Sequence, residues 1–161
     1  MRIGHGFDIH RLVAGRPLRL GGIAIPFESG LLGHSDGDAV LHAISDALLG
    51  ALADGDLGSH FPDSDPKNRD RDSVDFVQAV MRRLRARGYA VANLDVTVHA
   101  ERPKLAPHMS AIRTRVADLL AVTVDQVSIK AKTMEGLDAV GRGEAIAATA
   151  VVLIIPGAGA V

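Results

Sequence analysis

The chain shows two patterns of apolar and polar residues. Alternating or unbroken apolar stretches are typical of strands, and they lie at residues 2–10, 18–27, 90–100, 127–131 and 145–155. Apolar residues spaced three or four apart are typical of helices, and such stretches begin near Asp36 or Asp38, after Asp72 and near Pro107. Strands and helices mix without strict alternation, and no repeat or linker divides residues 1–161. The pattern predicts a single α+β domain, a sheet backed by helices.

Three segments show neither the strand pattern nor the helix pattern and are predicted to be loops. Residues 28–36 precede the first helix, and residues 133–144 form a glycine-rich, charged connection before the last strand. Residues 55–71 are polar and rich in Gly, Pro and Asp. A loop this long inside a compact domain is usually functional or mobile, so it becomes a candidate part of a site.

The last predicted strand is apolar on both of its faces. Residues Ala145–Ile155 are interrupted by a single polar residue, Thr149. The run is too short to span a bilayer and is typical of a buried strand. One layer of helices covers one face of a sheet, so the other face predicts a partner surface.

Composition narrows the classes of function. The 161 residues carry 18 basic and 19 acidic side chains, for a net charge of −1, and five aromatic residues, four Phe and one Tyr. This balance argues against nucleic acid or an anionic membrane as a partner. The chain has no Cys, which excludes disulfides, thiolate metal sites and a Cys nucleophile. Its start resembles a strand and not a signal peptide, so we expect a cytoplasmic protein.

Asp8, His10 and His42 are the strongest candidates for a metal site. Asp8 and His10 are two apart on a predicted strand and share a face, and His42 lies on the first helix. Three such ligands with an open fourth position are the composition of a catalytic zinc site. Asp38 or Asp46, one turn to either side of His42, could orient an imidazole. The alternative is that His42 is an ordinary, partly buried helix residue.

Three further groups are candidates for binding phosphate or metal. His34 and Ser35 precede a helix, where backbone N–H groups favour anions, although a capped helix start explains them equally well. The loop around Phe61 combines an aromatic residue with carboxylates, or is a polar surface loop with Phe61 in the core. Glu135, flanked by glycines, could bind phosphate or metal, or belong to an ordinary connection. Four arginines, Arg82, Arg83, Arg85 and Arg87, indicate a solvated helix face.

Several motifs, in order along the chain, resemble one enzyme family. They read GHGFDIHR, GLLGHSDGDAVLHAISDALLGA, DLGSHFPDSDP and, before the last strand, GRGE. Together they resemble the 2-C-methyl-D-erythritol 2,4-cyclodiphosphate synthase family, from Met1 to about Ile155. The resemblance implies a four-stranded mixed sheet backed by helices. It also implies a homotrimer with an active site between each pair of neighbouring subunits.

The resemblance also implies a reaction and its cofactors. The family converts 4-diphosphocytidyl-2-C-methyl-D-erythritol 2-phosphate to the 2,4-cyclodiphosphate and releases CMP, as a phosphorus–oxygen lyase of the non-mevalonate route to isoprenoid precursors. The 2-phosphate of the substrate attacks the β-phosphate of the same molecule. Zn²⁺, or a similar divalent cation, binds at Asp8, His10 and His42, and Mg²⁺ or Mn²⁺ accompanies the substrate diphosphate.

The family's functional residues map onto this chain position by position. The resemblance assigns the zinc to Asp8, His10 and His42, the second cation to Glu135, and catalytic hydrogen bonds to His34 and Thr133. In the first half of the chain the implied substrate-binding residues are Asp8, His10, His34, Ser35, Asp56, Leu57, Gly58, Phe61, Pro62, Asp63, Ser64 and Asp65. In the second half they are Ala100, Glu101, Arg102, Pro103, Lys104, Leu105, Ala106, Lys132, Thr133, Met134, Glu135, Ala139 and Arg142. Lys132 and Ala139 depart from the family's usual Thr and Phe.

Arg142 and Glu144, in the GRGE motif, suggest a further feature of the trimer. They are two apart and would form polar rings around an apolar central cavity that could hold an isoprenoid diphosphate, or else a simple Arg–Glu pair. Two other functions compete with the synthase. One is a zinc phosphohydrolase, which would release free phosphate. The other is a trimeric zinc-containing small-molecule sensor without catalysis, whose zinc would need a fourth protein ligand such as His5.

Overall fold

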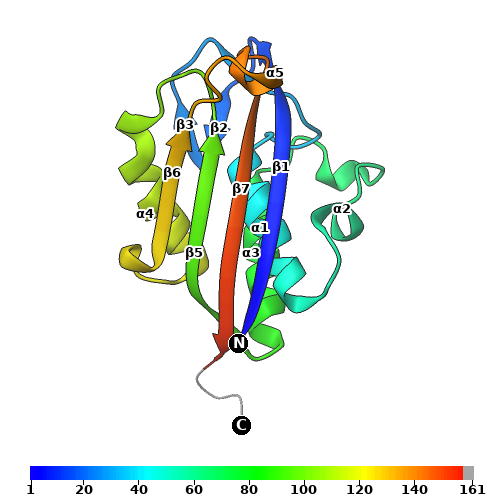
Figure 1. Ribbon diagram of the computed structural model, residues 1–161. Helices are drawn as coiled ribbons and strands as arrows, with labels where there is room; N and C mark the ends of the chain where they lie inside the picture. Colours follow the sequence, from blue (N-terminus) through cyan, green and yellow to red (C-terminus); the bar gives the residue numbers. More distant parts are fainter. Residues whose placement is uncertain (158–161) are drawn as a thin grey trace.

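The computed structural model describes residues 1–157 and contains one mixed sheet of five strands. Its strands lie in the order β4-β1-β7-β5-β6 (Figure 1). Their bounds are β1 Arg2–Ala14, β4 Ser29–Leu31, β5 Tyr89–His99, β6 Val127–Lys132 and β7 Ala145–Pro156. β5 and β6 run parallel, and the other neighbouring pairs run antiparallel. The predicted α+β fold is confirmed.

The sheet has five strands, so the four strands implied by the family resemblance are wrong by one. The fifth is β4, which pairs with the end of β1 through Leu12 and Leu31 and lies in the segment predicted to be a loop. Three residues are too few to show an alternating pattern. The predicted strand at 18–27 is also wrong. It is a separate hairpin of β2 (Leu18–Leu20) and β3 (Ile23–Ile25), because Gly21 and Gly22 reverse the chain with positive φ angles of 63° and 75°.

Three helices, α1 (Ala39–Leu52), α3 (Ser73–Ala86) and α4 (Met109–Leu120), form one layer against the sheet (Figure 1). α1 lies directly on β1, because two glycines of β1 leave room for its backbone. A Cβ atom at Gly4 would lie 1.8 Å from the carbonyl oxygen of Ala47, and one at Gly6 would lie 2.0 Å from that of Ala43. This close approach brings the first turn of α1 against the middle of β1.

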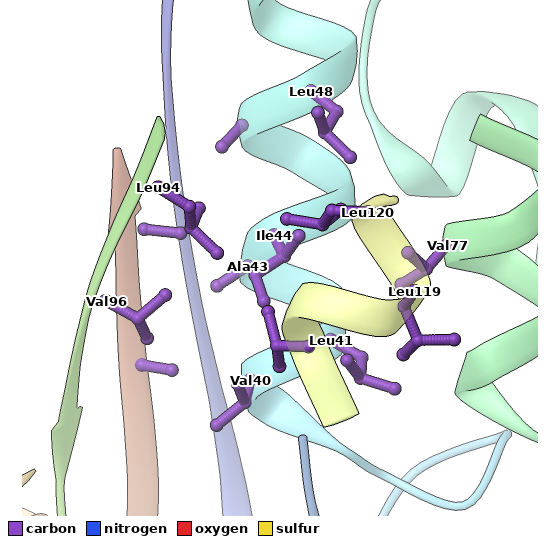
Figure 2. Packing of buried hydrophobic residues seen from close by; sticks show 14 of the residues in the cluster. Val40, Leu41, Ala43, Ile44, Leu48, Val77, Leu94, Val96, Leu119 and Leu120 are labelled. Carbon is purple, nitrogen blue, oxygen red and sulfur yellow. The ribbon is translucent and has the colours of Figure 1, made fainter. Parts of the chain in front are cut away.

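The core between sheet and helices is aliphatic, as the composition predicts. Figure 2 shows Leu94 and Val96 of β5 pointing toward the helices, where the labelled side chains of α1, α3 and α4 pack together. The fully buried examples labelled there include Val40, Ile44, Leu48, Val77, Leu94 and Val96. Each such side chain contributes roughly 1.5–3 kcal/mol by leaving water. This layer holds the metal-ligand candidates of α1 and β1 in place.

Three short helices lie in the segments predicted to be loops: α2 (Leu57–His60), η1 (Pro66–Asn68) and α5 (Asp138–Gly141). Two more flank α4: η2 (Ala106–His108) and η3 (Val124–Gln126). One turn of helix is too short to show periodicity in a sequence. The predicted starts of the first two long helices are confirmed, since the Asp38 and Asp72 side chains accept hydrogen bonds from the first backbone N–H groups of α1 and α3.

The second face of the sheet carries no long helix within residues 1–157; the short helix α5 alone packs there, with Val140 against Ala145 and Ala147 at the start of β7. Large apolar side chains of β1 and β7 lie exposed there: Ile3, Phe7, Ile9, Val151 and Ile155. This face is the one for which the apolar pattern of the last strand predicts a partner. Among the described residues, no helix is long and apolar enough to cross a membrane.

Candidate active site

Asp8, His10 and His42 converge on one point between β1 and α1. The Asp8 Oδ2 atom lies 2.8 Å from His10 Nε2 and 2.9 Å from His42 Nδ1, and the two nitrogens are 3.1 Å apart. Gly6, Asp8 and His10 alternate along the face of β1 that meets the helices, and His42 lies in the first turn of α1. The predicted metal-ligand group is therefore brought together, and its geometry could hold a metal ion.

The atoms in this cluster are free to act as ligands. His10 Nδ1 lies 2.8 Å from the carbonyl oxygen of Leu32, which can only accept, so the ring proton is on Nδ1 and Nε2 faces the cluster with its lone pair. Nε2 of His42 points the opposite way, toward the hydroxyls of Ser73 at 2.8 Å and Ser35 at 3.1 Å. Three donor atoms about 3.3 Å apart would surround a tetrahedral zinc, close to the separations observed.

The cluster opens on one side to a cavity of about 330 Å³. The side chains of Asp8, His10 and His42 are between 11% and 24% exposed, so they are held by the protein yet reachable. Residues around the cavity include His34, Ser35, Asp46, Leu57, Gly58, Phe61 and Asp63. Three protein ligands and an accessible fourth position are typical of a catalytic metal and not of a structural one.

The charges of the cluster favour ionised Asp8. Burial acts to raise the pKa of Asp8, but the adjacent imidazoles of His10 and His42 outweigh it and hold that pKa well below its usual range. Burial acts to lower the pKa of His10, and the adjacent Asp8 carboxylate outweighs it and raises that pKa. The cluster therefore keeps a carboxylate ready for a cation and attracts positive charge.

The predicted phosphate-binding pair lies beside the cluster. Ser35 is buried at the cavity wall and accepts a hydrogen bond from the Gly37 N–H at 3.3 Å, whereas His34 is exposed with its Nδ1 atom 3.5 Å from Asp63 Oδ2. Both residues line the cavity at the mouth of the metal-ligand group. A phosphate oxygen in this cavity could thus reach His34 and the fourth metal position together.

The loop predicted to cover the substrate divides into two sets. Leu57, Gly58, Phe61 and Asp63 line the cavity. Asp56 and Asp65 instead accept hydrogen bonds from backbone N–H groups and cap α2 and η1. Ser64 lines a neighbouring hollow of about 520 Å³, and Pro62 accepts a hydrogen bond from the Asn68 side chain.

Arg71 and Phe76 also belong to the site, although the sequence did not predict them. The Arg71 guanidinium carbon lies 5.4 Å from the centre of the Phe61 ring and 5.1 Å from that of Phe76, and the two rings are 4.8 Å apart. Phe76 lines the cavity and is nearly buried. The cation and two rings tie the loop to α3. No local pattern signals this contact, because its members come together through tertiary packing.

The predicted roles of Asp38 and Asp46 next to His42 are wrong. Asp38 caps α1 and accepts hydrogen bonds from the Gly21 and Gly22 N–H groups at 2.8 and 2.7 Å. Asp46 lines the cavity and accepts from the Leu57 N–H at 2.7 Å, which anchors α2. Neither carboxylate hydrogen-bonds an imidazole. His5 also cannot complete the metal site, because it lies on the opposite face of β1 from Asp8.

The other predicted substrate residues form a second, separate group. They lie at the end of β6 and in the segments after β5 and β6: Ala100, Glu101, Arg102, Pro103, Lys104, Leu105, Ala106, Lys132, Thr133, Met134, Glu135, Ala139 and Arg142. None of them lines the cavity beside the metal-ligand group in this chain. Thr133 donates a hydrogen bond to Glu135 at 2.8 Å, and Glu101 accepts one from the Met134 N–H at 3.2 Å. Ala100 and Leu105 are buried, so their backbones alone could meet a ligand.

The mixed sheet and the open Asp-His-His group beside a cavity define an α+β protein with a candidate metal-ligand group that is open on one side. The family model described as the YgbB family matches residues 1–155, and the chain belongs to this family. A relative from Trichlorobacter lovleyi is 58% identical over 97% of this chain and 99% of its own length. One from Pelobacter propionicus is 56% identical over 96% and 98%. Both are named 2-C-methyl-D-erythritol 2,4-cyclodiphosphate synthase.

Solved structures agree with these relatives. A 2-C-methyl-D-erythritol 2,4-cyclodiphosphate synthase solved in a CDP-bound form is 43% identical, with a TM-score of 0.89 over 96% of this chain and all of its own. The synthase of Plasmodium vivax is 35% identical, with a TM-score of 0.83 over 98% and 99%. The family predicted from the sequence motifs is confirmed, and with it the prediction that the protein is an enzyme.

Proposed function

We propose that the protein is a 2-C-methyl-D-erythritol 2,4-cyclodiphosphate synthase of the non-mevalonate route to isoprenoid precursors, working in the cytoplasm. Its substrate is 4-diphosphocytidyl-2-C-methyl-D-erythritol 2-phosphate. The observation that carries the proposal is the Asp8, His10 and His42 group, open to a cavity of about 330 Å³, in a chain similar along nearly its whole length to synthases of this name. The CDP in one related structure supports a cytidine-linked substrate.

The reaction needs a bond made and a bond broken at one phosphorus. An oxygen of the 2-phosphate bonds to the β-phosphorus of the same molecule, and the bond from that phosphorus to the bridging oxygen breaks. CMP leaves with the bridging oxygen and its electron pair. Because the nucleophile is part of the substrate, the protein needs no nucleophilic Ser or Cys. Its work is to position the phosphates and stabilise their charge.

Residues around the cavity and in the second group fit these tasks. Asp8, His10 and His42 would hold Zn²⁺, and Glu135 would hold Mg²⁺ or Mn²⁺ with the diphosphate. When bound, these cations polarise the phosphorus and neutralise charge on the leaving CMP. The His34 ring and the Thr133 hydroxyl donate hydrogen bonds to the developing charge. Ser35 binds a phosphate oxygen, and Phe61 with its loop covers the methylerythritol.

The homotrimer belongs to the same proposal. In one chain the residues that follow β5 and β6 lie apart from the cavity beside His42. The proposed substrate needs both these residues and those that line the cavity. The uncovered, apolar face of β1 and β7 supports an association of subunits through the sheet. An arrangement of three chains with an active site between neighbours would bring the cavity of one chain to Thr133 and Glu135 of the next.

An isoprenoid diphosphate in the centre of the trimer remains part of this proposal. On the uncovered sheet face, Phe7, Ile9, Met134 and Ala139 border a mainly apolar hollow of about 290 Å³. Arg142 pairs with Glu144 at 2.8 Å and is exposed, so its guanidinium is available for a diphosphate. Calorimetry with geranyl or farnesyl diphosphate tests this. Binding that Arg142→Ala weakens would support it, and no binding to the unmodified protein would refute it.

One incubation tests the central activity. The protein, loaded with Zn²⁺ and Mg²⁺, is mixed with the cytidyl substrate and followed by phosphorus NMR. A synthase forms the cyclic diphosphate and CMP together in equal amounts. Free phosphate would instead indicate a phosphohydrolase, and an unchanged but bound substrate would indicate a sensor; either result would contradict the proposal. The His42→Ala variant is the matched control for a contaminating activity.

A further inference from the structure

We propose that Ser73 and Asp36 are positioning residues of the metal site, which dictate that His42 presents an unprotonated Nδ1, and not Nδ1–H, to Asp8 and His10. This inference rests on the metal binding proposed above. The pair lies behind His42, on the side away from the cavity. Asp36 belongs to the turn before α1, and Ser73 is the first residue of α3. Both sit outside the residues that line the cavity, so they act on the site through His42.

The direction of each hydrogen bond follows from what each group can donate. The ionised Asp36 carboxylate has no proton and can only accept. The Ser73 hydroxyl makes a short hydrogen bond to Asp36 Oδ1, and the Ser73 N–H also donates to Asp36 Oδ2, at 3.2 Å. The hydroxyl proton is thereby committed to Asp36. The Ser73 oxygen can then only accept from His42 Nε2, which lies 2.8 Å away.

The consequence for the metal site is a choice of tautomer. A neutral imidazole carries one proton, so a proton on Nε2 leaves Nδ1 with a free lone pair. That lone pair faces Asp8 Oδ2 at 2.9 Å and His10 Nε2 at 3.1 Å. The opposite tautomer would place an N–H group inside the cluster, where it would occupy the position of a cation. Hydrogen bonds to the second nitrogen of a metal-binding His also raise its basicity as a ligand.

Burial stabilises this relay, the series of hydrogen bonds from His42 to Ser73 and from Ser73 to Asp36. Ser73 is fully buried and His42 is 9% exposed, so water does not compete for the Nε2 proton. Ser35 is a second hydroxyl near Nε2, at 3.1 Å, but it is also engaged by the Gly37 N–H. Ser73 has the shorter contact and the charged partner behind it. We therefore assign the tautomer to Ser73 and Asp36 and the phosphate contact to Ser35.

The first test compares two buried serines near His42. Ser73→Ala removes the acceptor for Nε2–H, and zinc affinity, measured by competition with a chromogenic chelator, should fall by about 10- to 100-fold. Ser45→Ala is the matched control. Ser45 is equally buried and lies one helical turn from His42, but its hydroxyl donates to the Leu41 carbonyl at 2.8 Å. The zinc affinity of Ser45→Ala should stay within about twofold of the unmodified protein.

The second test reads the tautomer without metal. Long-range proton–nitrogen NMR at pH 8 on metal-free, ¹⁵N-His-labelled protein should show His42 protonated on Nε2, and Ser73→Ala should shift the ring toward a mixture. Asp36→Asn removes the charge behind Ser73 and should change both readouts in the same direction but less. This variant carries the test if Ser73→Ala does not fold.

The outcomes separate the relay from the metal site. A His42 ring protonated on Nδ1 in the unmodified, metal-free protein would overturn the relay. So would folded variants that bind zinc as tightly as the unmodified protein. An Nε2–H ring in a protein that binds no zinc would support the relay and overturn the metal site proposed above.

Discussion

The two groups of predicted site residues differ in how far one chain completes them. Around Asp8, His10 and His42, each imidazole has one nitrogen in the cluster and the other hydrogen-bonded behind it. The turn after β6 is mostly exposed, and Thr133 and Glu135 there hydrogen-bond to each other. The first region is organised before any ligand arrives. The second region has the right residue types and no second wall, which is the difference expected if a neighbouring subunit supplies that wall.

The contrast has a physical origin in the packing of β1. The missing side chains of Gly4 and Gly6 let α1 approach the strand backbone, and this contact sets His42 against Asp8 and His10. The turns at the ends of β5 and β6 have no such layer over them. Glu135 there has a positive φ of 51°, which is uncommon for a non-glycine residue and directs the chain sharply between Thr133 and α5.

The largest expected effect comes from removing a ligand of the organised region. His42→Ala should abolish both bound zinc and turnover while the fold survives, because two remaining ligands hold zinc poorly. Metal analysis of the purified protein and the phosphorus NMR assay measure the two losses. His5→Ala, on the opposite face of β1, should change neither. Stoichiometric zinc in His42→Ala would refute the ligand assignment.

The next effect separates the second region from the first. Glu135→Gln should reduce turnover by about 100-fold or more, since a cation-holding charge is lost from the reacting diphosphate. Zinc content should stay unchanged, because Glu135 lies apart from the cluster. The control is Glu28→Gln, because Glu28 is exposed and belongs to neither group of site residues. Loss of zinc together with activity would mean that the two regions are one site within a single chain.

A smaller effect is expected at the loop that joins the cavity to α3. Arg71→Ala removes two cation–π contacts of about 0.5–1 kcal/mol each, so Phe61 should lose its fixed position. KM for the cytidyl substrate should rise by about three- to tenfold with zinc content unchanged. Steady-state kinetics measure this, with Arg82→Ala on the outer face of α3 as control. Equal kinetics for Arg71→Ala and the unmodified protein would remove Arg71 from the site.

The smallest effect is on stability. Asp54 accepts hydrogen bonds from Arg83 and Arg87 at 2.8 and 2.6 Å, and these arginines, Arg83 foremost, hold the pKa of Asp54 below its usual range. A lowered pKa stabilises the fold above the unfolded-state pKa, and the benefit is lost as pH falls through the folded-state pKa. Asp54→Asn should therefore lower Tm by a few degrees at pH 7. The difference should fade below about pH 4 in thermal scans, and a constant difference would contradict it.

Much of this contrast could be predicted from the sequence. The i, i+2 spacing of Asp8 and His10 and the helical stripe around His42 predicted one shared face, and the structure confirms it. Ser73, Arg71 and Phe76 were out of reach, because their contacts depend on how α3 packs against the turn before α1. The hairpin at Gly21 and Gly22 was also missed, although two adjacent glycines inside an apolar run are a signal for such a turn. In the turns after β5 and β6, the local pattern indicated only a glycine-rich connection with Glu135 as a candidate, and the family's motifs supplied the other residues.

Mixed trimers test most directly whether the two regions come from different subunits. His42→Ala and Glu135→Gln are inactive alone by the account above, each through a different region. Co-expressed and purified as mixed trimers, they should regain turnover at about one-third of all sites, because each mixed ring of three has one position where an intact cluster faces an intact Glu135 on the neighbouring chain. No recovery above the two separate variants, with mixed trimers confirmed by mass spectrometry, would contradict a site shared between chains.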